Sequence, residues 1–203
     1  MLFPHRNLLN MACEDLIVCP LHRVPERIKE CCQLINSEWK RSETARIRSL
    51  ECSSDNLPTS LILLKNGIVV GHCKLSRIPT INDACFVESV VIAKLCRGFG
   101  LGKYLMKKTE EYCRTFLKLN TIYLSTRGQE NFYAKLGYEN CEPVSIYGSC
   151  TKTNSTSTHN NSSSPSIKLN FTNCPPPPPM PLNNSPNILP NDKTFMKKHL
   201  NEN

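Results

Sequence analysis

Apolar residues in the first 150 positions recur at two different spacings, which predict strands alternating with helices. Six short runs rich in apolar and β-branched residues predict strands, at residues 16–21, 61–64, 68–70, 86–93, 122–124 and 144–147. Asn66-Gly67 stands between the second and third runs, and this pair favours the tight turn of a β-hairpin. The runs therefore predict one central sheet that includes a hairpin.

Three segments between these runs predict helices. Pro25 favours the first turn of a helix, and apolar residues follow it at helical spacing at Ile28, Cys31, Cys32, Ile35 and Trp39. Residues 100–118 carry a broad apolar face, and residues 129–136 predict a short helix that ends at Gly137. The fold class is therefore α/β or α+β, in a domain over residues 15–150 that follows a flexible stretch at 1–14.

The composition changes near residue 150. Asn, Pro, Ser and Thr supply 33 of the 53 residues from 151 to 203, and such a segment buries too little apolar surface to offset its ordering entropy. We predict that residues 151–203 form a disordered tail. Its polyproline motif, residues 175–179, favours the polyproline II conformation.

Charge and cysteine content narrow the possible partners. The net charge is +8, a mild surplus that favours acidic partners without indicating nucleic acid. The 12 cysteines form no CxxC pair and no zinc-type spacing with histidine, so no metal site is predicted. No apolar run is long enough for a signal peptide or a membrane span. We expect a cytosolic monomer with reduced thiols that binds neither nucleic acid nor membrane.

A glycine-rich run joins an apolar strand to an amphipathic helix. Gly98, Gly100 and Gly102 leave the main chain bare where helix N–H groups lack partners and the helix dipole is positive, which suits an anion such as phosphate. Two common phosphate motifs do not fit, because Lys103 stands where the dinucleotide motif needs glycine and Tyr104 where the P-loop needs Ser or Thr. A glycine-rich turn without a ligand is the alternative.

The arrangement Arg97-x-x-Gly100-x-Gly102 resembles the acetyl-CoA pyrophosphate loop of the GNAT N-acetyltransferase superfamily. Downstream, the run from Phe132-Tyr133 to Gly137-Tyr138 resembles the second signature of that superfamily, at the right distance from the first. The resemblance implies a GNAT fold, with a central mixed and mostly antiparallel sheet flanked by helices. It also implies acetyl-CoA as the cosubstrate.

Further segments resemble the actin N-terminal acetyltransferases, NatH. They are residues 39–42, 71–77, 87–91 and 132–138, together with the proline-rich tail, and the match covers roughly residues 15–150. This resemblance implies transfer of acetyl to the α-amine of the processed acidic N-terminus of actin, with an effect on the actin cytoskeleton. It also implies that residues 175–179 bind profilin, although SH3 or WW domains bind such motifs too.

The resemblance implies a set of cofactor contacts. We expect the main chain of Ser89, Val90, Val91 and Ile92 to pair with the pantetheine arm, and its N–H groups to polarise the thioester carbonyl. The pyrophosphate is expected on Arg97, Gly98, Phe99, Gly100, Leu101, Gly102 and Lys103. Thr126 and Gln129 are further contacts, although Thr126 stands where many relatives have asparagine and reaches less far.

Two residues are predicted to act on protons. An α-amine has a pKa near 8, so its deprotonation needs little help. Glu88 either acts as a base through water or holds the ammonium, and the alternative is a strand carboxylate paired with an arginine. Tyr133 matches the general acid that protonates the CoA thiolate, and the alternative is a tyrosine that packs on the cofactor.

The stretch from Trp39 to Arg48 carries four cations and one acid. Because arginines grip carboxylates with paired hydrogen bonds, this stretch predicts a site for an acidic N-terminus. The predicted substrate-binding residues are Trp39, Lys40, Arg41, Arg46, Arg48 and Glu88. The alternative is a solvated basic helix with Trp39 in the core.

Two other functions stay open at this stage. A GNAT-like protein without activity could serve as an adaptor for profilin, although the intact glycine loop and Tyr133 argue against it. The protein could instead acetylate lysine side chains or small amines. A lysine amine has a pKa near 10.4, and we see no dedicated base for it.

Overall fold

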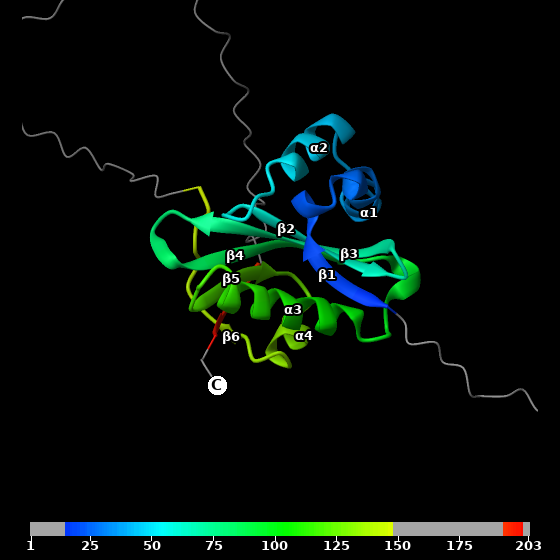
Figure 1. The fold of residues 1–203 in the computed structure, drawn as a ribbon. Coiled ribbons are helices and arrows are strands. Elements are labelled where there is room, and N and C mark those ends of the chain that lie inside the picture. Colours follow the sequence, from blue (N-terminus) through cyan, green and yellow to red (C-terminus); the bar gives the residue numbers. More distant parts are fainter. Residues whose placement is uncertain (1–14, 148–192, 201–203) are drawn as a thin grey trace, which may run out of the picture. The chain divides into compact units, whose positions relative to one another are not determined.

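The computed structural model describes residues 15–147 and 193–200, which form a sheet with helices on both faces (Figure 1). The strand order is β1-β2-β3-β4-β5-β7-β6, and every neighbouring pair is antiparallel except β4 and β5. The strands are β1 Leu16–Pro20, β2 Thr59–Lys65, β3 Ile68–Ile78, β4 Ile81–Ile92, β5 Thr121–Thr126, β6 Glu139–Asn140 and β7 Thr194–His199. The predicted mixed, mostly antiparallel sheet is therefore confirmed.

Four α-helices in the described ranges cover this sheet, α1 and α2 on one face and α3 and α4 on the other (Figure 1). They are α1 Ile28–Glu38, α2 Glu43–Glu51, α3 Leu101–Thr115 and α4 Glu130–Ala134, with short 3-10 turns η1 Leu21–Arg23, η2 Pro25–Arg27 and η3 Lys94–Cys96. The first predicted helix thus begins as the 3-10 turn η2 at Pro25 and continues as α1. No described helix has the length and apolar character needed to cross a membrane.

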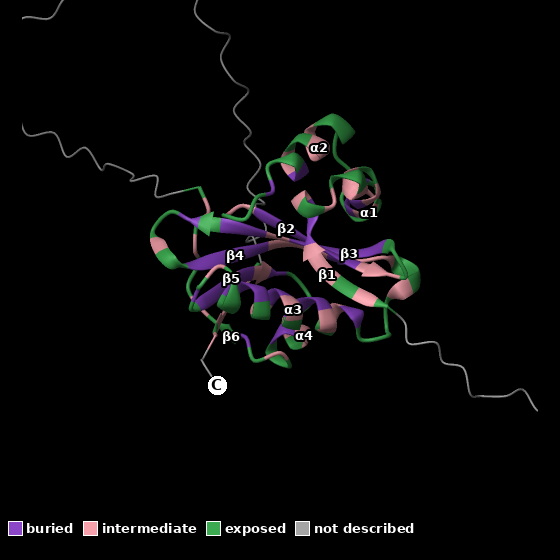
Figure 2. Ribbon diagram, in the orientation of Figure 1, coloured by how far each residue is buried: buried purple, intermediate pink, exposed green. Residues whose placement is uncertain are grey.

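Each face of the sheet has its own apolar core, and much of β2, β3 and β4 between them is buried (Figure 2). The larger core lies under α3, whose buried Leu105, Met106 and Cys113 pack on Leu75 and Leu124 of the sheet. A second core lies under α1 and α2. Residues 60–63 are buried in succession because β2 is covered from both sides, which explains why this strand is a continuous apolar run rather than an alternating one.

The end of the sheet differs from the sequence prediction. Residues 144–147 were expected to form the last strand, but they adopt no regular structure, and β6 and β7 occupy that edge. β7 lies inside the segment 151–203 that was predicted to be disordered, so that prediction is wrong for Thr194–His199. Met196 is 2% exposed and Phe195 meets Phe86 edge to face, so apolar contacts hold this strand in the sheet.

The position of β7 also changes the meaning of the proline-rich segment. Residues 141–193 lie in sequence between β6 and its paired neighbour β7, so the polyproline motif precedes a strand of the sheet along the chain. The motif at 175–179, and with it the predicted disorder of residues 151–192, lies outside the described residues. The flexible stretch predicted at 1–14 lies outside them as well.

Candidate active site

A bulge interrupts β4 in the middle of the sheet. In its pairing with β3, Glu88 lies opposite Lys74 and Val91 lies opposite His72, so Ser89 and Val90 together oppose the one residue between them. Ser89 has a φ of 54°, in the left-handed region that only a few non-glycine residues adopt. Such bulges bend a strand and re-aim its main chain, and they are frequent beside active sites.

The pairing between β4 and β5 ends just before this bulge. Their parallel pairing runs from Ala84 opposite Thr121 to Val87 opposite Leu124 and then ends, although β5 stays paired with β7 as far as Thr126. Within the described residues, no strand pairs with this edge of β4 beyond Val87. The main chain of residues 88–92 therefore offers an open edge on which an extended ligand can lie as an added strand.

The glycine loop, residues 97–102, lies between β4 and the body of α3. Gly98 and Gly100 have φ values of +85° and +79°, which favour glycine, and Gly100 precedes α3 as its N-cap. The first main-chain N–H bonded within the turn is that of Tyr104, to the Gly100 carbonyl, and no described side chain caps the helix. The N–H groups of residues 101–103 are therefore available to an anion, as the sequence predicted.

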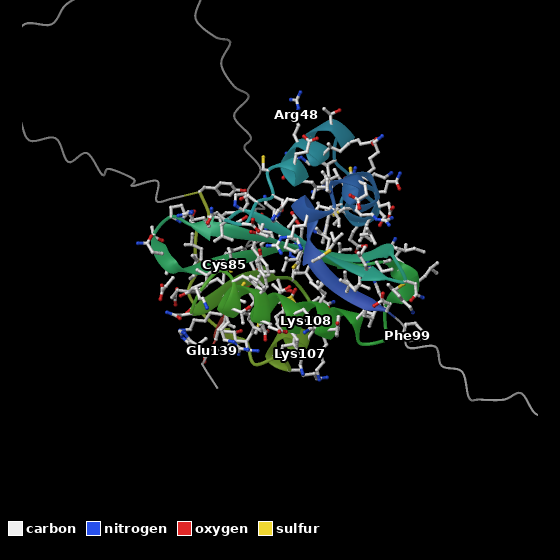
Figure 3. The ribbon with its side chains drawn as sticks, viewed as in Figure 1. Arg48, Cys85, Phe99, Lys107, Lys108 and Glu139 are labelled. Carbon is white, nitrogen blue, oxygen red and sulfur yellow. The ribbon has the colours of Figure 1, made fainter. Side chains whose placement is uncertain are left out.

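The bulge, the open edge and the glycine loop line one cavity of about 640 Å³. Most of the predicted cofactor contacts lie on its wall, namely Val90, Val91, Ile92, Arg97, Gly98, Gly100, Leu101, Gly102, Lys103, Gln129 and Tyr133. Three predicted contacts do not: Ser89, Phe99 and Thr126. Phe99 is 77% exposed and projects from the edge of the molecule (Figure 3), and Thr126 faces Thr194 across the pairing with β7.

Arg97 is held by the protein itself. Its Nε–H donates to the Ile92 carbonyl at 2.9 Å, and its terminal nitrogen donates to Glu38 at 2.8 Å. The Arg97 hydrogen bond lowers the pKa of Glu38, the last residue of α1. In this structure the guanidinium therefore joins the end of β4 to the end of α1, and anion binding by this loop falls chiefly to its main-chain N–H groups.

Tyr133 reaches the cavity from α4. It is 8% exposed and packs edge to face against Phe132 and Tyr138 at 5.0 and 5.7 Å between ring centroids. Burial, with a smaller contribution from Cys73, raises the pKa of Tyr133 to about 12. The phenol therefore keeps its proton at neutral pH and can donate it into the cavity.

The Glu88 carboxylate makes a hydrogen bond and an ion pair on the face of the sheet that α1 and α2 cover. The Ser76 hydroxyl donates to its Oε1, and the Lys74 ammonium lies 3.8 Å from the same oxygen. The carboxylate does not belong to the cavity wall, although it directly precedes the bulge. The arrangement is close to the structural alternative considered from the sequence, with Lys74 as the cation in place of an arginine.

The basic stretch divides into a loop and a helix. Trp39 is 45% exposed and lines the cavity, so it does not belong to the core. Lys40 and Arg41 lie exposed in the loop that follows α1. Arg48 lies on α2 and points away from the sheet (Figure 3). The structure therefore brings Trp39 to the site with Lys40 and Arg41 beside it in sequence, and separates Arg48 from it.

Arg46 holds this loop in place. Its Nε–H donates to Asn36 at 3.1 Å and its terminal nitrogen donates to the Trp39 carbonyl at 2.9 Å, while Asn36 donates to the Arg41 carbonyl at 3.2 Å. Burial lowers the pKa of Arg46, and nearby Arg41 adds to this effect. The predicted role of Arg46 in binding a substrate is therefore secondary to its structural contacts.

Four residues on the cavity wall were not among the predicted site residues: Glu38, Cys96, Arg127 and Phe132. Phe132 belongs to the second signature and Arg127 follows Thr126, so proximity in sequence to predicted residues could have indicated both. Glu38 carried no local signal, because its partner Arg97 is 59 residues away.

Comparison with known proteins identifies the family. Residues 21–138 match the acetyltransferase (GNAT) family, so the chain belongs to this family, whose members use acetyl-CoA. The chain is 38% identical to mouse N-alpha-acetyltransferase 80 over 140 residues, which are 66% of this chain and 44% of the mouse protein. It therefore spans less than half the length of that relative.

Solved structures show the same fold. A GNAT acetyltransferase from Staphylococcus aureus superposes with a TM-score of 0.55 at 16% identity, covering 92% of this chain and 100% of that one. N-acetylglutamate synthase from Neisseria gonorrhoeae, solved with coenzyme A and L-arginine, gives 0.51 at 14% identity, covering 63% of this chain and 28% of that one. The open β4 edge, the unpaired N–H groups of residues 101–103 and the cavity between them fit acetyl-CoA.

Proposed function

We propose that this protein is an N-terminal acetyltransferase that moves acetyl from acetyl-CoA to the α-amine of an acidic protein N-terminus, with actin as the substrate. The observation that carries the proposal is the cavity in which Trp39 of the basic loop and Tyr133 of α4 share one wall with the glycine loop. The similarity to mouse N-alpha-acetyltransferase 80 favours an α-amine as the acceptor. Acetylation of actin would then affect the actin cytoskeleton.

Different residues of the chain bind the cofactor, align it and donate the proton in this reaction. Acetyl-CoA, when bound, supplies a thioester carbonyl carbon that bonds to the amine nitrogen as the carbon–sulfur bond breaks. The N–H groups of residues 101–103 hold the diphosphate, and the open edge at Val90, Val91 and Ile92 aligns the pantetheine arm. The Tyr133 hydroxyl holds the proton that the departing sulfur takes up.

Glu88 has a smaller role in this scheme. Its carboxylate is fixed by Ser76, partly neutralised by Lys74 and outside the cavity wall, so it attracts the substrate ammonium only weakly and from a distance. A neutral α-amine is available near neutral pH because the pKa of the group is about 8. We therefore propose that Glu88 orients the amine and that the proton leaves through water.

Acetyl transfer to short peptides tests the proposal. We expect transfer to a peptide that starts with three aspartates, and little transfer to the same peptide with a blocked N-terminus and an internal lysine. Tyr133→Phe should lower kcat by roughly 100-fold, the usual size of a general-acid contribution, while CoA still binds. An adaptor would bind CoA without turnover, and a lysine acetyltransferase would prefer the blocked peptide.

The polyproline motif supports a further part of the proposal. We propose that residues 175–179 bind profilin and thereby raise the concentration of profilin-bound actin at the active site. Deleting residues 174–182 should slow acetylation of profilin-bound actin and leave the short peptide unaffected. Equal losses on both substrates would show that the segment does not act as a tether, and binding to SH3 or WW domains alone would replace profilin as the partner.

The thiols suggest where the protein works. All nine described cysteines are free, and Cys85 and Cys113 share a hydrogen bond with their sulfur atoms 3.6 Å apart and form no disulfide. Free thiols so close together suit a reducing compartment, and we propose the cytosol. Fractionation of cells that express the tagged full chain tests this location.

A further inference from the structure

His72 lies buried beneath the bulge of β4. Its side chain is on β3 opposite Val91, is 1% exposed, and places Nδ1 3.2 Å from the Ser89 carbonyl oxygen. Because a carbonyl only accepts hydrogen bonds, Nδ1 must carry the hydrogen and Nε2 must be the bare nitrogen. The contact therefore fixes the tautomer of the ring.

The other ring nitrogen has no partner. Nε2 is buried and makes no hydrogen bond to any of the described residues. Burial, aided by the charges of Arg46 and Lys74, lowers the pKa of His72 to about 4 despite the opposing effect of the Ser89 hydrogen bond. The ring therefore stays neutral and keeps its one N–H on Nδ1, directed at Ser89.

The residue that receives this hydrogen bond is the strained one. Ser89 has the left-handed φ of 54°, and a residue of this kind keeps such a conformation only where its surroundings impose it. The next two residues, Val90 and Val91, lie on the wall of the cavity at the open edge of β4. The conformation of Ser89 thus decides how the main chain of both valines meets a ligand.

We infer that His72 is a positioning residue, which holds the Ser89 carbonyl through Nδ1–H so that the main chain of Val90 and Val91 is presented to the acetyl end of the cofactor. The inference rests on the proposed function, because it assigns to this edge the polarisation of the thioester carbonyl. His72 itself is buried and does not line the cavity. Its contribution should appear in the rate of the chemical step and not in cofactor binding.

Three variants of the full chain separate this role from packing. His72→Leu keeps an apolar shape and removes the donor. His72→Asn keeps an N–H donor near the position of Nδ1 and removes Nε2. Ile62→Val is the matched control, because Ile62 is buried directly opposite His72 on β2 and has no contact with the bulge through hydrogen bonding. Each variant is measured for kcat, for KM of acetyl-CoA and for its thermal unfolding midpoint.

We expect His72→Leu to lower kcat by about tenfold to 100-fold with little change in KM, since loss or displacement of one positioned donor has effects of this order. Its unfolding midpoint should change little, because removal of the unpartnered Nε2 offsets loss of the hydrogen bond to the Ser89 carbonyl. His72→Asn should recover kcat to within a few-fold of the wild type. Ile62→Val should lower the midpoint and leave kcat unchanged.

Several results would overturn the inference: wild-type kcat in His72→Leu, or a loss in His72→Asn as large as in His72→Leu. If the wild type acetylates no peptide, the proposed function fails, and amide NMR signals then test the positioning role alone. In that case His72→Leu should displace the Val90 and Val91 signals and alter their response to CoA, whereas His72→Asn should not. Unchanged signals in His72→Leu would contradict the inference independently of activity.

Discussion

Several charged residues at this site are held by hydrogen bonds to other residues of the protein. Arg97 is bound to Glu38, Arg46 to Trp39 and Asn36, and Glu88 to Ser76. The glycine loop and the strand before it carry local sequence signals, and most of the residues predicted there line one cavity. It could not predict these pairings, since partners such as Glu38 and Arg97 lie far apart along the chain.

His72 makes folding sensitive to acid. Its pKa is lowered from 6.5 to about 4 in the folded protein, so between these values the unfolded chain binds a proton that the native chain does not. Stability therefore rises with pH across this window and falls as the pH drops from 6.5 toward 4. Denaturant titrations should show this fall, at most about 3 kcal/mol for this group, and His72→Leu should reduce it. An identical pH dependence in both proteins would contradict the assignment.

Arg41 and Arg46 should respond differently to charge reversal. Arg41→Glu places a negative charge in the exposed loop beside Trp39, so KM should rise for a peptide that starts with aspartates and change little for a neutral peptide. Arg46→Glu removes the contacts to Trp39 and Asn36, so both peptides should be affected and the unfolding midpoint should fall. Equal effects of Arg41→Glu on both peptides would remove the loop from the acidic-substrate site.

At the scale of elements, α1 and the glycine loop are joined by one ion pair. Glu38 ends α1 and engages Arg97 at 2.8 Å, and Trp39 follows it directly. The basic loop and the cofactor loop are therefore held in one arrangement. The apolar periodicity predicted where the strands and helices lie, but the ion pair between them comes only from the folded structure.

Removing the charge of Glu38 should favour the cofactor. Glu38→Gln weakens the interaction with Arg97. The Arg97 guanidinium then becomes available to the diphosphate. The pair is solvent-exposed and contributes little, so KM for acetyl-CoA should fall by a few-fold at most. Acetyl-pantetheine, which lacks the diphosphate, is the matched control and should show no change. A similar fall with both donors would mean that Arg97 is not released toward the diphosphate.

The fold of the whole molecule includes β7, a strand that the amino-acid composition of its region did not indicate. The 53 residues after position 150 are dominated by Asn, Pro, Ser and Thr, and this average hides the six residues of β7. The hydrophobic pattern of these six residues alone does not indicate a strand. β7 forms because β5 and β6 pair with it on either side. The central strands were predictable because each carries an apolar, β-branched run of its own, however short.

Met196 tests how far the fold relies on β7. Its side chain is 2% exposed and packs in the core under α3, so Met196→Ala should lower the free energy of unfolding by about 2–5 kcal/mol. Denaturant unfolding measures this loss. Lys197→Ala alters the neighbouring position, whose ammonium lies 3.7 Å from the exposed Glu139, and should cost less than about 1 kcal/mol. Equal costs would show that β7 is not integrated into the core.

The placement of β7 between β5 and β6 has one more consequence. A protease that cut once within residues 148–192 would yield two polypeptides, and the smaller one would still carry the central strand of this edge. Hydrogen bonds along both sides of that strand, and the buried Met196, would keep the pieces together. The nicked enzyme should therefore survive as a noncovalent two-fragment complex, and the fragments produced separately should complement each other.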